Sequence, residues 1–257
     1  MGALRYVPDR HIMSNQKMDD INLLAAEVNK IISEVDYNTT LEIIAEKGGS
    51  SGGARPKVLI NIKGEPWIVK FPSSYDQADI GNIEYNYSLV AKKCGVEMPE
   101  TALLEGKYFG VHRFDRDGSR RIHMHTASGL LYASHRFPSL DYTDLIKATL
   151  ALTKNTVEAY KLFRLMVFNI LTGNKDDHAK NFSFIYKSGN WRLSPAYDLV
   201  PNNGFNGNHS TTIDGKGNPS IDDIYEVVRQ CGLKQKKAKE IFEKVYDNSN
   251  EIRMVTW

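Results

Sequence analysis

The chain has 257 residues, of which 41% are hydrophobic and 25% charged, which is typical of a globular protein with one large or two modest cores. Its 33 Lys and Arg against 31 Asp and Glu give a net charge of +2, too balanced to indicate a nucleic-acid or membrane partner. Cys94 and Cys231 form no C-x-x-C pair, no run of 18 apolar residues occurs and no signal-peptide core opens the chain, so we expect a cytoplasmic protein.

One helix is predicted near the N-terminus. Residues 1–15 are irregular, and we expect them to pack as an arm on the first lobe. From Asp19 to about Val35, apolar side chains recur every three or four residues, which is the period of a helix with one buried face. The acidic start complements the positive end of the helix dipole. This helix is therefore expected to pack into a core.

A glycine-rich segment follows, with four glycines among residues 48–53, and leads to Lys57. Because glycine has no Cβ atom, its backbone N–H groups can approach a phosphate closely. The segment matches neither G-x-x-x-x-G-K-[ST] nor G-x-G-x-x-G, so a flexible linker is the alternative. Residues 58–62 and 67–71 then predict an antiparallel strand pair, which favours the phosphate-binding interpretation.

Lys70 is a lone cation inside the second of these strands. Such a lysine usually lies at an exposed edge or extends its ammonium to water. The functional alternative is the strand lysine of kinases, which pairs with ATP phosphates and a helix glutamate. Glu84 lies near the start of the next predicted helix, residues 80–94, which Gly95 ends. The order of strand lysine and helix glutamate is the one that this ion pair needs.

Residues 101–114 predict two further strands around a turn at residues 105–107. We place a lobe boundary after residue 114. Residues 1–114 would then form a small β-rich lobe, and residues 115–257 a larger, mostly helical lobe. In this interpretation the backbone from His112 to Phe114 is a crossing strand that can hydrogen-bond an adenine edge.

The second lobe is predicted to be built on one long helix. Asn155 and Glu158 resemble a capping box, and the helix that they open runs to about residue 171, roughly 25 Å at 1.5 Å per residue. Apolar residues cover most of its circumference, which predicts that the helix is buried. It would hold the following loop, residues 174–181, rigidly at its end.

That loop reads N-K-D-D-H-A-K-N. Asp176 and Asn181 have the D-x-x-x-x-N spacing of kinase catalytic loops, in which the Asp accepts the attacking hydroxyl's proton and the Asn holds a metal. Residues 182–193 predict a hairpin, which would bring Asp198 beside Asn181. Together their oxygens suit Mg²⁺. Alternatively, Asp176 and Asp177 cap a neighbouring element and Asp198 forms a turn.

The histidines lack metal-site spacing, which argues against a His/Cys metal centre, and His178 is expected to orient the loop by hydrogen bonding. Residues 202–219 predict a mobile loop, either inert or in contact with substrate. Ser220 is expected to cap a helix to about Gln230, which Gly232 follows, and the lysines of the last helix to form a solvated face.

In this order, the residues resemble the HipA-like serine/threonine kinases, toxins of bacterial toxin–antitoxin operons. The match covers nearly the whole chain and rests on seven ordered motifs. They are G-A-L-R-Y-V-P at 2–8, S-S-G-G-A-R-P-K at 50–57, V-K-F at 69–71, E-Y at 84–85, H-R-F-D-R at 112–116, N-K-D-D-H-A-K-N at 174–181 and S-P-A-Y-D at 194–198.

The resemblance implies a bilobed α+β fold of the protein-kinase type that uses ATP and Mg²⁺. It implies that Asp176 is the catalytic base, that Asn181 and Asp198 are Mg²⁺ ligands and that Lys70 is the ATP lysine. Other residues expected at the ATP site are Ser51, Gly52, Gly53, Lys57, Glu84, His112, Phe114, His178 and Lys180.

The resemblance also implies that Ser50 is autophosphorylated, which switches the enzyme off, and adjacent Ser51 could share this role. A phosphoserine adds roughly −1.5 to −2 charges and would repel ATP phosphates from the loop. Arg55 departs from the family pattern because many members carry Gln there. A second departure is that G-A-L-R-Y-V-P stands at the start, where longer members carry a further subdomain.

The chain therefore resembles the short, HipT-like form, and the implied partners follow from that. They are a small HipS-like protein that supplies the subdomain, a HipB-like helix-turn-helix antitoxin, DNA through that antitoxin, and a protein substrate such as an aminoacyl-tRNA synthetase. A small-molecule phosphotransferase and a non-catalytic module that assembles with the antitoxin on operator DNA are the alternatives.

Overall fold

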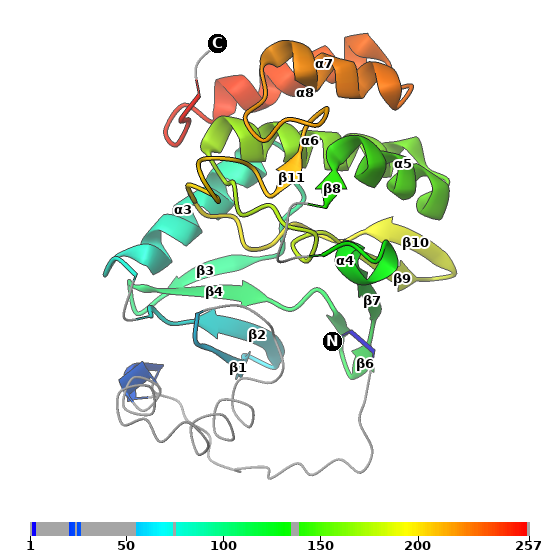
Figure 1. Cartoon of the computed structure of the whole chain (residues 1–257). Helices are drawn as coiled ribbons and strands as arrows, with labels where there is room; N and C mark the ends of the chain where they lie inside the picture. Colours follow the sequence, from blue (N-terminus) through cyan, green and yellow to red (C-terminus); the bar gives the residue numbers. More distant parts are fainter. Residues whose placement is uncertain are drawn as a thin grey trace. The chain divides into compact units, whose positions relative to one another are not determined.

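The computed structural model describes residues 2–3, 21–23, 25–26, 55–73, 76–134 and 139–255 (Figure 1). The chain forms two compact units, one from residues 1–85 and 100–121 and the other from residues 86–99 and 122–257. Each unit combines helices with antiparallel strands, so the expected α+β class is confirmed. Residues 116–117 and 120–121 form a short antiparallel ribbon within the first unit.

The first unit is built on a four-stranded sheet. Its strands are β1 (Lys57–Ile62), β2 (Glu65–Lys70), β3 (Thr101–Leu104) and β4 (Tyr108–His112), in the antiparallel order β1-β2-β4-β3 (Figure 1). Lys63 and Gly64 join β1 to β2 with φ angles of 52° and 89°, as a two-residue hairpin with the right-handed twist requires. Both predicted strand pairs are therefore confirmed. The ribbon consists of β5 (Arg116–Asp117) and β6 (Arg120–Arg121).

The core of this unit lies on one face of the sheet. Phe71 and Tyr108 meet edge to face with ring centroids 5.0 Å apart, beside buried Val58 and Val69. Of the helix predicted at 19–35, residues 21–23 and 25–26 are described and helical. Ile21 and Ala25, four positions apart, both pack on this core, as one helix face should. The remaining residues of that prediction lie outside the described part.

Helix α3 (Ile80–Lys93) follows the sheet's first hairpin. It ends as predicted, because Gly95 adopts a φ of 80° and the N–H of Val96 reaches back to Ala91 O. Near its start, Gly81 touches the β3–β4 turn: a Cβ atom built there would lie 2.1 Å from Lys107 O. Only glycine permits this approach of helix to backbone.

The second unit is mostly helical. It contains α4 (Ala127–Leu130), α5 (Tyr142–Thr153), α6 (Thr156–Thr172), α7 (Ile221–Gln230) and α8 (Gln235–Asn248). A sheet in the order β10-β9-β7 joins β7 (His123–Thr126), β9 (Ser183–Lys187) and β10 (Asn190–Leu193), and β8 (Leu140–Asp141) pairs with β11 (Thr211–Thr212). Helix α5 packs against α6, α8 packs against α6, and α7 contacts both α5 and α8 (Figure 1).

Helix α6 is the buried centre that the sequence predicts, with almost every residue from Glu158 to Thr172 buried. Asn155 caps it by accepting from Val157 N–H. The capping-box prediction is wrong in its second half, however. Glu158 instead accepts from the N–H of Leu193 at 2.9 Å. A buried carboxylate is destabilising unless a donor hydrogen-bonds it, and the Leu193 N–H is such a donor.

The C-terminal predictions are also confirmed. Ser220 and Asp223 form a reciprocal capping box on α7, which ends at Gln230 before Gly232. The lysines of α8 are exposed, and Lys237 lies over the Tyr160 ring, 4.2 Å from its centroid. Among the described helices, none has the length and apolar character that crossing a bilayer requires.

Gly81→Ala tests the close approach of α3 to the β3–β4 turn. In an open helix this change is favourable, but here the new methyl group meets backbone atoms of Lys107 and Phe109. We expect a loss of about 1–3 kcal/mol in the free energy of unfolding, measured by urea titration. The exposed neighbour Asn82→Ala is the control and should change stability by less than about 0.5 kcal/mol.

Candidate active site

The loop of residues 174–181 is anchored where α6 ends. Gly173 closes the helix with a φ of 66°, and the N–H of Asn174 bonds back to Asn169 O at 3.0 Å. The side chains of these two asparagines also bond, from Asn174 Nδ2 to Asn169 Oδ1 at 3.0 Å. The loop therefore begins as a direct and fixed continuation of the central helix.

Asp177 is the main anchor of the loop. Its carboxylate is buried and accepts from four groups: the Tyr142 hydroxyl at 2.8 Å, His209 Nδ1 at 2.9 Å, and the N–H groups of Ser210 and Thr211 at 2.9 and 3.2 Å. A carboxylate has about four lone-pair positions, so this buried charge is fully hydrogen-bonded. Burial, followed by the negative charge of Asp177, raises the pKa of Tyr142, which keeps its hydroxyl protonated as a donor.

The alternative reading of the acidic doublet, as residues that cap a neighbouring element, holds for Asp177. It caps the start of β11, across more than 30 positions of sequence. The sequence left open which of the two adjacent aspartates has this role, and it did not identify His209, because a local pattern does not reveal which aspartate is buried. The segment from 202 to 219 is accordingly tied to the loop through Asp177 and through Lys175, whose Nζ bonds to Gly207 O at 2.6 Å.

Asp176 points the other way, and its side chain is 49% exposed. Asn181 Nδ2 donates to Asp176 O at 2.7 Å, and Asn181 N–H donates to His178 O at 2.8 Å. The two ends of the D-x-x-x-x-N motif are thus bonded to each other. Because the amide nitrogen faces a carbonyl, Asn181 Oδ1 is left pointing away as a possible ligand.

The expected orienting role of the His178 side chain is not found. Its Nδ1 is buried with no hydrogen-bond partner among the described residues, and Nε2 lies 3.9 Å from Asp176 Oδ1, beyond hydrogen-bond reach. The loop is instead held by the His178 carbonyl, which accepts from Asn181. Main-chain geometry replaces the side-chain contact that the sequence suggested.

The predicted hairpin is confirmed and brings its ends together. Strands β9 and β10 pair from Asn190 with Lys187 to Leu193 with Phe184, and Ser194 N–H continues the ladder to Ser183 O at 2.8 Å. The Tyr197 hydroxyl then donates to Lys180 O at 2.7 Å. Because Lys180 precedes Asn181 and Tyr197 precedes Asp198, this bond ties the two candidate metal ligands to one region.

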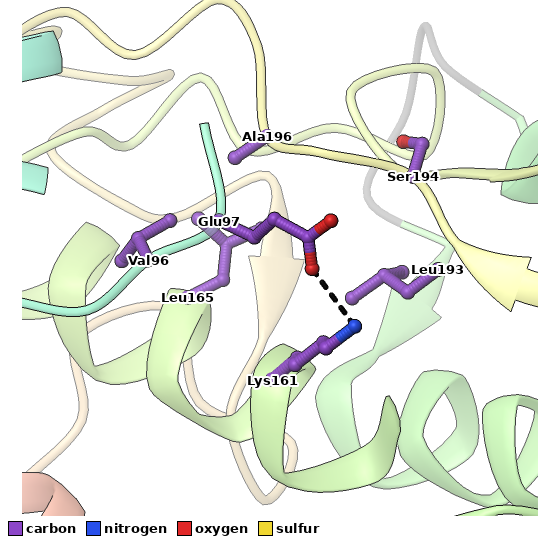
Figure 2. A pocket seen from close by; sticks show the side chains of 7 residues that line it. All are labelled: Val96, Glu97, Lys161, Leu165, Leu193, Ser194 and Ala196. Atoms are coloured by element: carbon purple, nitrogen blue, oxygen red, sulfur yellow. Dashed lines mark ion pairs between the residues drawn. The ribbon is translucent and has the colours of Figure 1, made fainter. Parts of the chain in front are cut away.

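A cluster of charges on α6 supports the segment that leads to Asp198. Figure 2 shows the small pocket there, in which Lys161 faces Glu97. Lys161 Nζ lies 2.8 Å from Glu97 and 2.9 Å from Glu158, and Ala196 N–H bonds to Glu97 O at 2.8 Å. Burial opposes the charge on Lys161, but the hydrogen bonds that its ammonium donates to Glu97 and Glu158 raise its pKa. The segment is therefore held by main-chain and ionic contacts together.

Asn181 and Asp198 fit a magnesium ion by their chemistry, since amide and carboxylate oxygens are the ligands that Mg²⁺ takes from proteins while it keeps several waters. Asp198 has a φ of 56°, a left-handed conformation that aspartate tolerates better than most residues. Within the described ranges, no three His, Cys, Asp or Glu side chains cluster as a metal site. A site here would rely on few protein oxygens, as is usual for Mg²⁺.

In the first unit, Lys70 and Glu84 form the ion pair that the sequence suggested. Lys70 Nζ lies 2.5 Å from Glu84 Oε1, with the two side chains 11% and 3% exposed. Lys57 is the register partner of Lys70 across β1 and β2, so both lysines are on one face of the sheet. Ser50, Ser51, Gly52 and Gly53 lie outside the described residues.

The adenine-edge prediction for residues 112–114 is wrong for two of its donors. The N–H of His112 bonds to Glu100 O and that of Arg113 to Pro66 O, both at 2.9 Å, because β4 continues its pairing through these residues. The His112 ring instead lies 3.3 Å from Glu65 Oε2. Neither of these N–H groups is available to a nucleotide.

Residues 49–252 match the model of the HipA-like C-terminal domain family. The chain belongs to this family. In structure, it resembles HipA of Shewanella oneidensis, solved in a complex with HipB and operator DNA, with a TM-score of 0.63 and 22% identity over 77% of this chain and 56% of that one. At this identity the likeness supports the HipA-like fold.

Two curated relatives are named "Putative kinase". One, from Sinorhizobium fredii, is 29% identical over 155 residues, which are 53% of this chain and 37% of the relative. The other, from Haemophilus influenzae, is 28% identical over 183 residues, 60% of this chain and 53% of the relative. The chain thus spans about a third to a half of the length of these relatives.

Asp177→Ala tests the loop anchor. The change leaves four donors without their acceptor around a buried cavity. We therefore expect a loss of about 3–5 kcal/mol in the free energy of unfolding, measured with guanidinium chloride. Its neighbour Asp176→Ala is the matched control and should cost less than about 1 kcal/mol, because its side chain is half exposed. Equal losses for the two variants would contradict the anchor role.

Proposed function

We propose that this HipA-like protein is an ATP- and Mg²⁺-dependent protein serine/threonine kinase that acts as the toxin of a toxin–antitoxin system. One observation carries the proposal: the Asp176 side chain is exposed on a loop that Asp177 anchors, and Asn181 Nδ2 donates to the Asp176 carbonyl. The Lys70–Glu84 pair and the family membership support it. The names of the two curated relatives point the same way.

In the proposed reaction, Asp176 takes the proton of a serine or threonine hydroxyl as its oxygen attacks the γ-phosphorus of ATP. The bond from phosphorus to the bridging oxygen breaks, and ADP leaves. A general base of this kind contributes about 10²–10⁴ in rate. Asp176 suits the role because Asp177 holds the loop, which leaves the Asp176 side chain exposed to solvent.

Asn181 and Asp198 would hold Mg²⁺, which when bound neutralises charge on the phosphates. Lys70 would contact the same phosphates, with Glu84 holding the ammonium in place. Lys57, His178 and Lys180 remain proposed neighbours of the nucleotide. Phe114 also remains a proposed contact of ATP, whereas His112 could take part only through its side chain or carbonyl.

The partners belong to the same proposal. The related HipA was solved with HipB and operator DNA, which supports a helix-turn-helix antitoxin as partner and DNA contact through it. We further propose a cytoplasmic protein substrate such as an aminoacyl-tRNA synthetase, a small HipS-like partner, and control by autophosphorylation at Ser50 or Ser51. A phosphate there would repel ATP from the adjacent loop.

The decisive experiment incubates dephosphorylated wild type and Asp176→Asn with Mg-ATP and maps phosphate by mass spectrometry. We expect phosphate on Ser50 or Ser51 of the wild type and a rate at least about 10²-fold lower in the variant, which lacks the base. Because Asp176 is half exposed, the variant should keep its melting temperature, and this separates lost chemistry from lost fold.

The other outcomes decide between the alternatives. Transfer to sugars or antibiotics rather than to protein would establish a small-molecule phosphotransferase. No transfer and no ATP binding by the folded wild type would leave a non-catalytic module that assembles with the antitoxin. Either result would overturn the proposal of a protein kinase.

Metal removal provides a separate test. EDTA should abolish transfer, and Asn181→Ala should raise the Mg²⁺ concentration for half-maximal rate by about tenfold or more, since one ligand is lost. Lys187→Ala, at the exposed end of β9, is the control and should keep the wild-type Mg²⁺ requirement. Unchanged Mg²⁺ titrations for Asn181→Ala would exclude it as a ligand.

A further inference from the structure

Four charged side chains gather at the end of β2 in the first unit. Lys70 is the last residue of β2, Glu84 lies on α3, Asp76 lies between them in sequence and Arg55 precedes β1. Glu84 is 3% exposed and Lys70 11%, while Arg55 and Asp76 are 25% and 13% exposed. With two positive and two negative groups, this Arg55 cluster is balanced in charge.

Glu84 divides its carboxylate between two cations. Oε1 lies 2.5 Å from Lys70 Nζ, and Oε2 lies 3.6 Å from Arg55 Nη1. A carboxylate held at both oxygens cannot rotate freely about its terminal bond. The position of Glu84, and through it that of the Lys70 ammonium, therefore depends on the guanidinium on its other side.

Arg55 is itself clamped by Asp76. Its Nε donates to both Asp76 oxygens, at 3.0 and 3.1 Å, and Nη2 lies 3.0 Å from Oδ1. Asp76 Oδ2 also accepts from the N–H and hydroxyl of Ser73, at 2.8 and 2.7 Å. Burial opposes the charge on Asp76, but these bonds from Ser73 and Arg55 lower its pKa, so it is ionised at neutral pH. The guanidinium is thus held at a fixed angle.

The clamp is also attached to the strand that carries Lys70. Ser73 lies three residues after Lys70, and the N–H of Phe71 bonds to Pro56 O at 2.9 Å, next to Arg55 in sequence. Residues 70–73 therefore carry the lysine, the residue that bonds to Pro56 beside Arg55, and the serine that fixes Asp76. These contacts restrict how far the Arg55 guanidinium can move relative to the Lys70 ammonium.

We propose that Arg55 is a positioning residue for Lys70, acting through Glu84 and anchored by Asp76. This inference rests on the proposed function, since the place of the ammonium matters for catalysis when it meets ATP phosphates. A fork of N–H donors suits this task better than a single ammonium, because it engages two carboxylates in fixed directions.

Arg55→Met tests the proposal, and Asp76→Asn tests the clamp. We expect kcat/KM for Mg-ATP to fall about 10- to 100-fold in Arg55→Met and less in Asp76→Asn, with KM for the protein acceptor unchanged. Arg116→Met is the matched control. Arg116 is 15% exposed and lies 2.9 Å from Asp115 in the same unit, so its loss removes a similar ion pair remote from Lys70, and kcat/KM should stay within twofold.

A second readout does not depend on activity. The side-chain ammonium signals of ¹⁵N-lysine protein are recorded, and the Lys70 signal is assigned by its loss in Lys70→Arg. We expect this signal to shift in Arg55→Met and to stay in place in Arg116→Met. A Lys70 signal that does not move in Arg55→Met overturns the positioning role, whatever the activity.

The two readouts separate the failures. A wild type that transfers no phosphate, with a Lys70 signal that still shifts in Arg55→Met, defeats the proposed function and leaves the positioning role intact. An active wild type whose Arg55→Met variant keeps kcat/KM within twofold shows that the position of Lys70 is not set by Arg55 for catalysis. An equal loss in Arg116→Met would mean general damage to the unit and would also overturn the inference.

Discussion

The geometry of the candidate site depends on one buried carboxylate. The Asp177 carboxylate lies away from water, and four donors satisfy it, two of them backbone N–H groups at the start of β11. Asp177 thereby fixes the loop, while the adjacent Asp176 side chain stays 49% exposed, as the proposed role of Asp176 as base requires.

The first unit keeps a buried carboxylate charged by a different means. Glu84 Oε1 lies 2.5 Å from Lys70 Nζ, and its Oε2 lies 3.6 Å from Arg55 Nη1. Two of the donors to Asp177 are backbone N–H groups, which give the loop a fixed anchor. Cations give a carboxylate whose place follows the charges around it, so a change in either partner alters the other. This difference explains why Asp177 is structural, whereas Glu84 can tune a lysine.

Local signals were enough to predict much of this architecture. Alternation with turn residues identified both hairpins, and caps and apolar periodicity identified α3, α6 and α7. The failures concern partners that are distant in sequence. The Glu158 carboxylate accepts from the N–H of Leu193 rather than from the start of its own helix. The N–H of His112 donates to Glu100 O and is therefore not available to a ligand. The capping role was left open between Asp176 and Asp177, because only the folded chain shows which aspartate of the pair is buried.

Asp198 shows how the surrounding contacts maintain a strained residue. A φ of 56° costs a residue with a Cβ roughly 1–2 kcal/mol, and such conformations persist where neighbouring contacts fix them. Here the preceding Tyr197 is held by Lys180 O and by Ser183 Oγ, at 2.7 and 2.5 Å. Burial also raises the pKa of Tyr197, so its hydroxyl keeps the proton that it donates. The strained Asp198 thus follows a residue whose side chain is fixed to the backbone just before Asn181.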